Sequence, residues 1–263
     1  MGELGILVVG HGTRKREGQL QLFRLAAQIQ SLLPGTTLTH SFLELAEPTI
    51  EQGLAYLADR SVRKVLVVPI LLFEAGHAKR DIPDAVQSNA GPRKLEVVGF
   101  TPPLSCHPKV LELSGRRLLQ SLEKSGLTLE EAQRLGLGIA MVGRGGSDRE
   151  AIREMLHLTE LRRAQYESKW NKTGFMAIAK PNLNELLQGA MRKSLGCVVV
   201  QPHLLFEGAI MDEIRETVRE FQGNDPKRRW IIADPLGECD ELAKVFIELI
   251  NTSTAKRQPP KSS

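Results

Sequence analysis

The segment VLVVPILLFE (Val65–Glu74) recurs 133 positions later as VVVQPHLLFE (Val198–Glu207), with seven of ten residues identical. The same offset aligns the two halves of the chain without a gap from about residue 5 to residue 104. It places the tripeptide GHG (Gly10–Gly12) on GRG (Gly143–Gly145). One offset that persists over this length indicates a duplicated structural unit rather than chance matches.

Each copy alternates short β-branched apolar runs with longer helical patterns. In the first copy the predicted strands are Gly5–Val9, Thr36–Phe42, Lys64–Ile70 and Glu96–Gly99, and the predicted helices are Glu17–Leu33, Thr49–Arg60, Ile82–Ser88 and Pro108–Lys124. In the second copy the predicted strands are Gly138–Val142, Gly174–Ile178, Cys197–Pro202 and Trp230–Ala233. Nearly continuous apolar strands are typical of a parallel sheet that is buried on both faces. The alternation therefore predicts an α/β fold of βαβ units in three layers.

The length of 263 residues suits two domains of about 130 residues, as the repeat requires. We predict a first domain over residues 1–125, which carries the active site, and a second, degenerate copy over residues 136–250. The linker between them contains a predicted helix at Leu129–Leu135. The polar, Pro-containing segment 251–263 is predicted to be a disordered tail.

Composition excludes several classes of protein. No apolar run approaches the roughly 20 residues that span a bilayer, and the N-terminus has no basic stretch typical of a signal peptide. The three cysteines are far apart, outside any C-x-x-C, which favours a reducing cytoplasm over a disulfide framework. The formal charge is only +4, with two Trp, two Tyr and no recognisable nucleic-acid motif. We therefore expect a cytoplasmic protein that binds neither membranes nor nucleic acid.

Three candidate metal ligands or proton acceptors each follow a different predicted strand of the first copy: His11, Glu44 and His77. The carboxyl ends of parallel strands meet at one edge of the sheet, where ligands of such folds bind. At the same positions the second copy has Arg144, Ala177 and Ile210. We therefore predict that the first copy alone carries the site.

Two imidazoles and a carboxylate suit a divalent transition metal such as Co, Fe, Ni or Zn, with positions left open for a substrate. The glycines that flank His11 allow close approach of the backbone to a bulky ligand. Basic residues near these histidines would suit an anionic small molecule: Arg14, Lys15, Arg16, Lys79 and Arg80. A solvated charged surface accounts for them equally well.

Other polar residues have structural interpretations. Glu74 and Glu207 occur in both copies, so they are expected to stabilise a strand end. His203 aligns with Ile70 within a strand, which favours a core or interface position, and His40 is a candidate to support Glu44. The glycines at Gly143–Gly146 could cradle a phosphate, but a turn inherited from the ancestral GHG is favoured.

Three motifs of the first copy carry a family resemblance: VVGHGTR (Val8–Arg14), SFLELAEPTI (Ser41–Ile50) and VPILLFEAGHAKRDIP (Val68–Pro83). The chain resembles the class II tetrapyrrole metal chelatases of the sirohydrochlorin cobaltochelatase and ferrochelatase family, in their long, two-domain form. The resemblance covers nearly all of the chain up to about residue 250. It implies two flavodoxin-like halves with a cleft between them, whose second wall the degenerate copy would form.

The resemblance implies a lyase that inserts a divalent metal into sirohydrochlorin or a related reduced tetrapyrrole, in cobalamin or siroheme biosynthesis. It assigns metal binding and proton removal to His11, His77 and Glu44. The basic residues Arg14, Lys79 and Arg80 would pair with substrate carboxylates. No ATP and no organic cofactor are expected, and cobalt is favoured over iron on the long-form resemblance alone. A duplicated chain is expected to be a monomer.

Two other functions compete with this interpretation. A tetrapyrrole or metal carrier would need the same histidines without turnover. A histidine phosphatase would have an arginine before the histidine of its R-H-G motif, and Gly10 occupies that place. A purely structural protein is disfavoured, because three ligand-type residues are predicted at one sheet edge.

Overall fold

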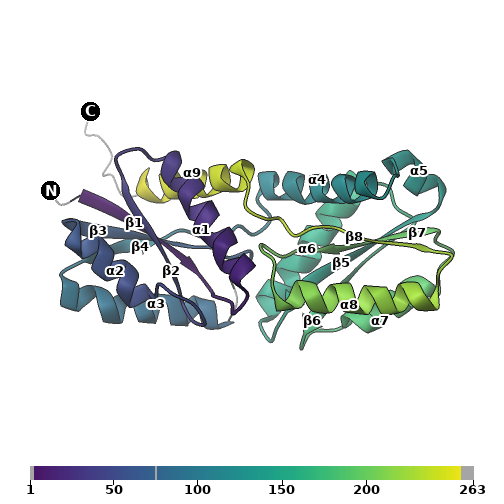
Figure 1. The fold of residues 1–263 in the computed structure, drawn as a ribbon, viewed down its shortest axis with the longest axis horizontal. Helices are drawn as coiled ribbons and strands as arrows, with labels where there is room; N and C mark the ends of the chain where they lie inside the picture. Colours follow the sequence, from purple (N-terminus) through teal and green to yellow (C-terminus); the bar gives the residue numbers. More distant parts are fainter. Residues whose placement is uncertain (1–2, 75, 256–263) are drawn as a thin grey trace. The chain divides into compact units, whose positions relative to one another are not determined.

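A computed structural model describes residues 3–74 and 76–255, and the side chains of residues 3 and 76–79 are outside the described set. The chain divides into two compact units. The first comprises Met1–Ser105 and Glu238–Ser263, and the second comprises Cys106–Gly237. Figure 1 labels the helices and strands of both units.

The first unit contains a four-stranded parallel sheet in the order β2-β1-β3-β4. Its strands are β1 (Glu3–Gly10), β2 (Thr37–Phe42), β3 (Val62–Pro69) and β4 (Glu96–Phe100). The two central strands are buried on both faces, since Ile6, Leu7, Leu66 and Val67 are all buried. Helices must therefore cover the sheet from both sides.

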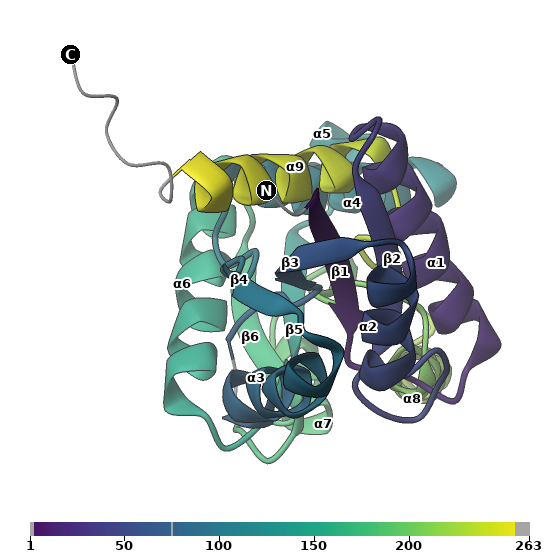
Figure 2. The ribbon, with the colours of Figure 1, turned by 90° about the vertical axis from the view of Figure 1, so that its left-hand side faces the viewer.

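The helices of the first unit form two pairs. Helix α1 (Arg16–Ser31) leads from β1 to β2, whereas α2 (Ile50–Asp59) and α3 (Gly76–Ala90) lead across the sheet in the opposite direction. Right-handed crossovers place connections of opposite direction on opposite faces. Helix α1 packs against α9 (Asp240–Ala255), and α2 packs against α3, so each face has a helix pair (Figure 2). A short 3-10 helix, η1 (Gly91–Arg93), precedes β4.

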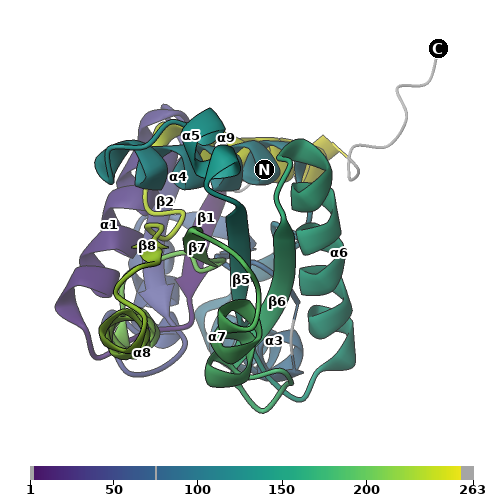
Figure 3. The same cartoon turned by 90° about the vertical axis from the view of Figure 1, so that its right-hand side faces the viewer.

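The second unit repeats this plan, with parallel strands in the order β6-β5-β7-β8 (Figure 3). Its strands are β5 (Leu137–Gly145), β6 (Trp170–Ala177), β7 (Cys197–Pro202) and β8 (Arg229–Ile232). Its helices are α4 (Pro108–Lys124), α5 (Leu129–Arg134), α6 (Arg149–Gln165), α7 (Leu183–Met191) and α8 (Ala209–Asn224). Helix α4 packs against α6, and α7 packs against α8. No described helix is long and apolar enough to cross a membrane.

The two copies exchange one helix. The 133-residue offset aligns α4 with α9, yet α4 belongs to the second unit and α9 to the first. Helix α4 contacts β7 and β8, while α9 contacts α1 and β3 and buries Leu242, Val245 and Phe246. The division predicted at residue 125 therefore differs from the boundary in the structure. The chain leaves the first unit after Ser105 and returns to it at Glu238.

The duplication extends to details of the backbone. The bonds Glu47-Pro48 and Lys180-Pro181 are both cis, and these prolines occupy equivalent positions. The next residue in each copy, Thr49 or Asn182, caps the following helix in a capping box. The common fold of the two halves is thus encoded at the strand-to-helix connections as well as in the strands.

Three predicted boundaries are corrected. Strand β6 begins at Trp170 rather than Gly174. The first residues of this edge strand are partly polar, so the apolar pattern did not reveal them. Helix α3 begins at Gly76 rather than Ile82 and contains Pro83, a residue that usually marks a first turn. Helix α9 continues to Ala255, so residues 251–255 of the predicted tail are helical. Residues 256–263 are outside the described residues.

Candidate functional site

His11 and Glu44 meet at the carboxyl edge of the first sheet. His11 directly follows β1, and Glu44 follows β2 by two residues. The Nε2 atom of His11 lies 3.2 Å from Oε1 of Glu44, with 33% and 53% of the two side chains exposed. The pair is therefore both in contact and open to a ligand. The sequence prediction that these two residues share one edge is confirmed.

The backbone explains why the two side chains meet. The amide N of Glu44 donates to the carbonyl oxygen of His11 at 3.1 Å, and Leu43 donates to Gly10 at 2.9 Å. The β1–β2 pairing thus continues past the ends of both strands. Gly12 has a φ of +105°, and a Cβ atom there would lie 1.7 Å from the carbonyl oxygen of Glu44. Only glycine allows this approach.

The second copy keeps this backbone but not the side chains. Gly145 has a φ of +76°, and a Cβ atom there would lie 2.3 Å from the carbonyl oxygen of Ala177. The register also pairs Gly145 with Ala177. However, Arg144 stands where His11 stands, and Ala177 where Glu44 stands. The imidazole–carboxylate pair is therefore absent from the second copy, although the loop that would hold it is present.

The other predicted site residues are less completely described. His77 belongs to the first turn of α3, which follows β3 in the chain, but its side chain and that of Lys79 are outside the described residues. Arg14 and Arg80 are exposed, and neither forms an ion pair within the described part of the chain. Within that part, no group of three His, Cys, Asp or Glu side chains could hold a metal ion. The structure thus brings together two of the three predicted ligands.

Glu74 and Glu207 differ, despite their common sequence context. Glu207 forms a bidentate ion pair with Arg215 of α8, at 2.7 and 2.8 Å, and this contact raises the pKa of the Arg215 guanidinium. This ion pair supports the expected structural role of Glu207, and the partner that the structure gives is an arginine of α8. Arg215 aligns with the buried Ile82 of the first copy. Glu74 is exposed and has no partner among the described residues, so the expectation that it stabilises a strand end is not met there.

Two other histidines have structural positions. The ring of His40 lies edge-on to Phe23 and Phe42, at centroid distances of 5.4 and 6.1 Å. Burial lowers the pKa of His40. The expectation that His40 supports Glu44 is wrong, because its neighbours are aromatic rings. His203 is 2% exposed within the second unit, which confirms its predicted core position.

The described residues thus form a duplicated parallel α/β fold with an imidazole–carboxylate pair at the sheet edge of the first half. The chain belongs to the CbiX family, which matches residues 5–121 and 138–253. Both copies are therefore members of one family, as the 133-residue repeat indicated.

Several relatives share this two-domain length. The chain is 30% identical to a sirohydrochlorin ferrochelatase from Priestia megaterium over 94% of this chain and 89% of the relative. It is 28% identical to a sirohydrochlorin cobaltochelatase from the same organism, over 92% and 78%. The structure of SirB from Bacillus subtilis with Fe3+ has a TM-score of 0.80 at 24% identity, over 97% of this chain and 96% of that one. That similarity establishes the fold.

Proposed function

We propose that this protein is a sirohydrochlorin chelatase, a lyase that inserts a divalent metal ion into sirohydrochlorin or a closely related tetrapyrrole. Relatives of matching length are named for this reaction with iron and with cobalt. Cobalt is the metal expected from the sequence, but relatives of this length are named for each metal, so length does not discriminate between cobalt and iron. The observation that carries the proposal is the 3.2 Å contact between His11 Nε2 and Glu44 Oε1.

That distance suits two ligands of one metal ion. Bonds of about 2.0–2.2 Å from an imidazole nitrogen and a carboxylate oxygen, at tetrahedral or octahedral angles, leave the two atoms roughly 3 Å apart. A metal ion could therefore bind between the two atoms without a large movement of either side chain. His77, on the first turn of α3, is the proposed third ligand.

The reaction requires proton acceptors as well as ligands. A divalent metal ion replaces two pyrrole protons of the tetrapyrrole, so two protons must leave as two metal–nitrogen bonds replace two nitrogen–hydrogen bonds. Neutral imidazole and ionised carboxylate can each accept a proton near pH 7. We assign this role to Glu44 and His11, whose side chains are open to solvent and can pass the protons on.

The periphery of the substrate needs cationic partners. Sirohydrochlorin carries carboxylate side chains around a flat, apolar ring. Arg14 and Arg80 are exposed, lack ion-pair partners in the described part of the chain and belong to the segments that hold His11 and His77. We propose that these residues and Lys79 pair with substrate carboxylates, for which the arginine fork is well suited.

The remaining expectations also belong to the proposal. We propose that insertion proceeds without ATP and without an organic cofactor, and that the protein acts as a monomer in the cytoplasm. The free thiols of Cys106, Cys197 and Cys239 support a reducing compartment. Size-exclusion chromatography with light scattering measures the molar mass and so tests whether the protein is a monomer.

The test is anaerobic incubation of the purified protein with sirohydrochlorin in large excess and Co²⁺ or Fe²⁺, followed by tetrapyrrole absorption. We expect many turnovers per protein molecule in the wild type, and a loss of at least about 100-fold in His11→Ala. Ile210→Ala, at the position equivalent to His77, is the matched control and should retain turnover. Near-wild-type turnover in His11→Ala would contradict the site.

The same assay separates the enzyme from a carrier. A carrier would give one stoichiometric spectral change per protein molecule, however large the excess of substrate. That result would be compatible with the proposed metal ligands but would contradict catalysis. The ratio of the Co²⁺ and Fe²⁺ rates then tests the metal preference directly, because the affinity order of nitrogen and oxygen ligands does not reveal the physiological metal.

A further inference from the structure

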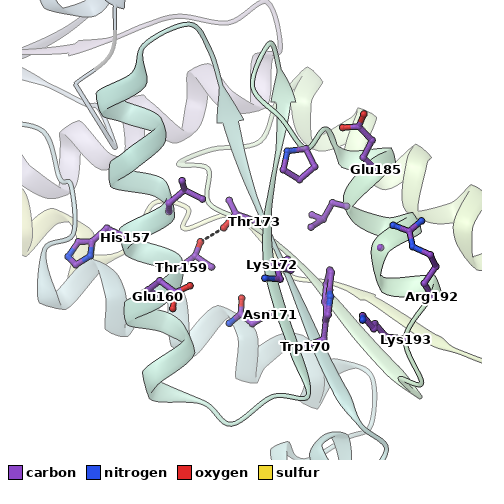
Figure 4. A pocket seen from close by; sticks show the side chains of 14 residues that line it. His157, Thr159, Glu160, Trp170, Asn171, Lys172, Thr173, Glu185, Arg192 and Lys193 are labelled. Carbon is purple, nitrogen blue, oxygen red and sulfur yellow. Dashed lines mark hydrogen bonds between the residues drawn. The ribbon is translucent and has the colours of Figure 1, made fainter.

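A groove of about 840 Å³ lies along the edge strand β6, between α6 and α7 (Figure 4). We call it the β6 groove. Trp170, Pro181 and Leu186 line it with apolar side chains, of which Trp170 is 9% and Leu186 2% exposed. Its volume is within the range of about 300–1,000 Å³ that is usual for small-molecule sites. It belongs entirely to the second unit, whose copy of the His–Glu site is absent.

The β6 groove has an excess of positive charge. Lys172, Arg192 and Lys193 line it, and none of them forms an ion pair with any described residue. The two carboxylates of the groove are already paired. Glu160 lies 3.5 Å from Arg163, and Glu185 lies 2.9 Å from Lys180. An anion in the groove would therefore meet three uncompensated cations.

These cations are not needed to end helix α7. Basic residues often follow a helix because they stabilise its last carbonyl groups. Here Arg228 already does so, since its guanidinium donates to the carbonyl oxygens of Ala190 at 2.7 Å and Lys193 at 3.1 Å. The side chains of Arg192 and Lys193 are left to face the groove, on the same side of β6 as Trp170 (Figure 4).

A glycine keeps the groove open beside the indole. A Cβ atom on Gly189 would lie 3.8 Å from Cζ2 of Trp170 and 3.9 Å from Nη2 of Arg192, with no closer neighbour. Packing therefore does not require glycine at this position of α7. A glycine in a helix costs about 1 kcal/mol relative to alanine. What Gly189 provides is the open space between the Trp170 indole and the Arg192 guanidinium.

The first copy serves as an internal control. Its equivalents of Trp170, Lys172, Gly189 and Arg192 are Thr37, Thr39, Tyr56 and Asp59. There the Tyr56 ring occupies the position of the glycine, and the Arg60 guanidinium lies over it at 3.5 Å. The indole, the open space and two of the three cations are thus features of the second copy alone, whereas Arg60 of the first copy stands at the position of Lys193.

We propose that the β6 groove binds a small aromatic polyanion, whose ring lies against Trp170 beside Gly189 and whose carboxylate or phosphate groups pair with Lys172, Arg192 and Lys193. The inference is independent of the proposed chelatase activity, because it rests on the second unit alone.

The test is isothermal titration calorimetry of the full chain, without metal or tetrapyrrole, with two probes. Benzene-1,3,5-tricarboxylate represents an aromatic carboxylate ligand, and ADP represents an aromatic phosphate ligand. We expect one-to-one binding of at least one probe with a dissociation constant below about 1 mM. The tighter probe identifies the anionic group. Arg192→Asp and Lys172→Thr, which install the residues of the first copy, should each weaken binding at least tenfold.

Lys244→Glu is the matched control. Lys244 is exposed on α9 in the other unit, lacks an ion-pair partner among the described residues, and its substitution changes the net charge as Arg192→Asp does. Binding should be unchanged in this variant. If Arg192→Asp does not fold, Lys193→Gln replaces it. The proposal is overturned by equal weakening in Lys244→Glu, or by absence of saturable binding of both probes.

Discussion

Gly12 and Glu44 are in such close backbone contact that a single methyl group on Gly12 would overlap the carbonyl oxygen of Glu44, at 1.7 Å. Gly145 and Ala177 repeat the relationship at 2.3 Å in the second unit. The geometry that brings His11 to Glu44 is therefore a property of the ancestral loop. Only the side chains distinguish the two loops: His11 and Glu44 in the first copy, Arg144 and Ala177 in the second.

Gly12→Ala should disrupt this contact and separate the His11–Glu44 pair. A residue other than glycine at this φ costs about 1–3 kcal/mol, before the overlap is counted. We expect a lower melting temperature by calorimetry and a loss of metal insertion. The matched variant Gly145→Ala should destabilise the second unit and spare turnover. Equal activity in the two variants would contradict the assignment of the site to the first copy.

Glu44→Gln keeps the shape of the side chain and removes its charge. If Glu44 is a ligand or proton acceptor, turnover should fall by about 10² or more, with little change in stability, because the side chain is half exposed. Steady-state insertion rates and thermal melting measure the two effects. Glu47→Gln, an exposed carboxylate on the same loop, should behave as wild type. A variant with unchanged turnover would remove Glu44 from the reaction.

Glu207→Ala should destabilise the second unit by about 1 kcal/mol, since it breaks a partly exposed bidentate pair with Arg215 that solvent screens. Both tryptophans of the chain, Trp170 and Trp230, lie in this unit, so their fluorescence during urea unfolding measures the change. Glu74→Ala should leave stability unchanged, because Glu74 is exposed and has no partner in the described part of the chain. A larger loss of stability in Glu74→Ala than in Glu207→Ala would refute the distinction between these two carboxylates.

His203 makes the second unit sensitive to acid. Burial, with a further contribution from the Arg162 charge, lowers the pKa of His203 to about 3 in the folded protein, from 6.5. Between these values the unfolded chain binds one more proton, so the free energy of unfolding falls as pH falls, by up to about 1.4 kcal/mol per pH unit. His203→Ile, the residue of the first copy, should lose less stability between pH 7 and 5 by tryptophan fluorescence. An equal loss of stability between pH 7 and 5 in the wild type and in His203→Ile would contradict this prediction.

Repetition made much of the fold predictable. The offset fixed by Val65–Glu74 and Val198–Glu207 aligned the strands, and apolar continuity identified both central strands. The helices at Pro108–Lys124 and Leu129–Arg134 are where their patterns indicated. The family match confirms the resemblance carried by the GHG and LLFE motifs. The His11–Glu44 contact was predictable because parallel strands end at one edge.

Other features depend on contacts that a local pattern does not encode. Helices α4 and α9 each have an apolar face, and periodicity alone does not indicate which sheet that face covers. The polar start of β6 predicts a loop, because Asn171 and Lys172 interrupt the apolar run. The β6 groove unites residues from β6 and the end of α7, none of which forms a motif. The role of His77 remains a prediction, because its side chain is outside the described residues.

The exchange of α4 and α9 ties the history of the two copies together. After duplication, a redundant copy that has lost its reactive side chains would ordinarily be free to disappear. Here its deletion would remove α9, with Leu242, Val245 and Phe246, from the core that supports His11 and Glu44. The second copy therefore supplies a structural part of the first unit. The surface of the second copy can change, but the segment that forms α9 must stay if the core of the first unit is to stay intact.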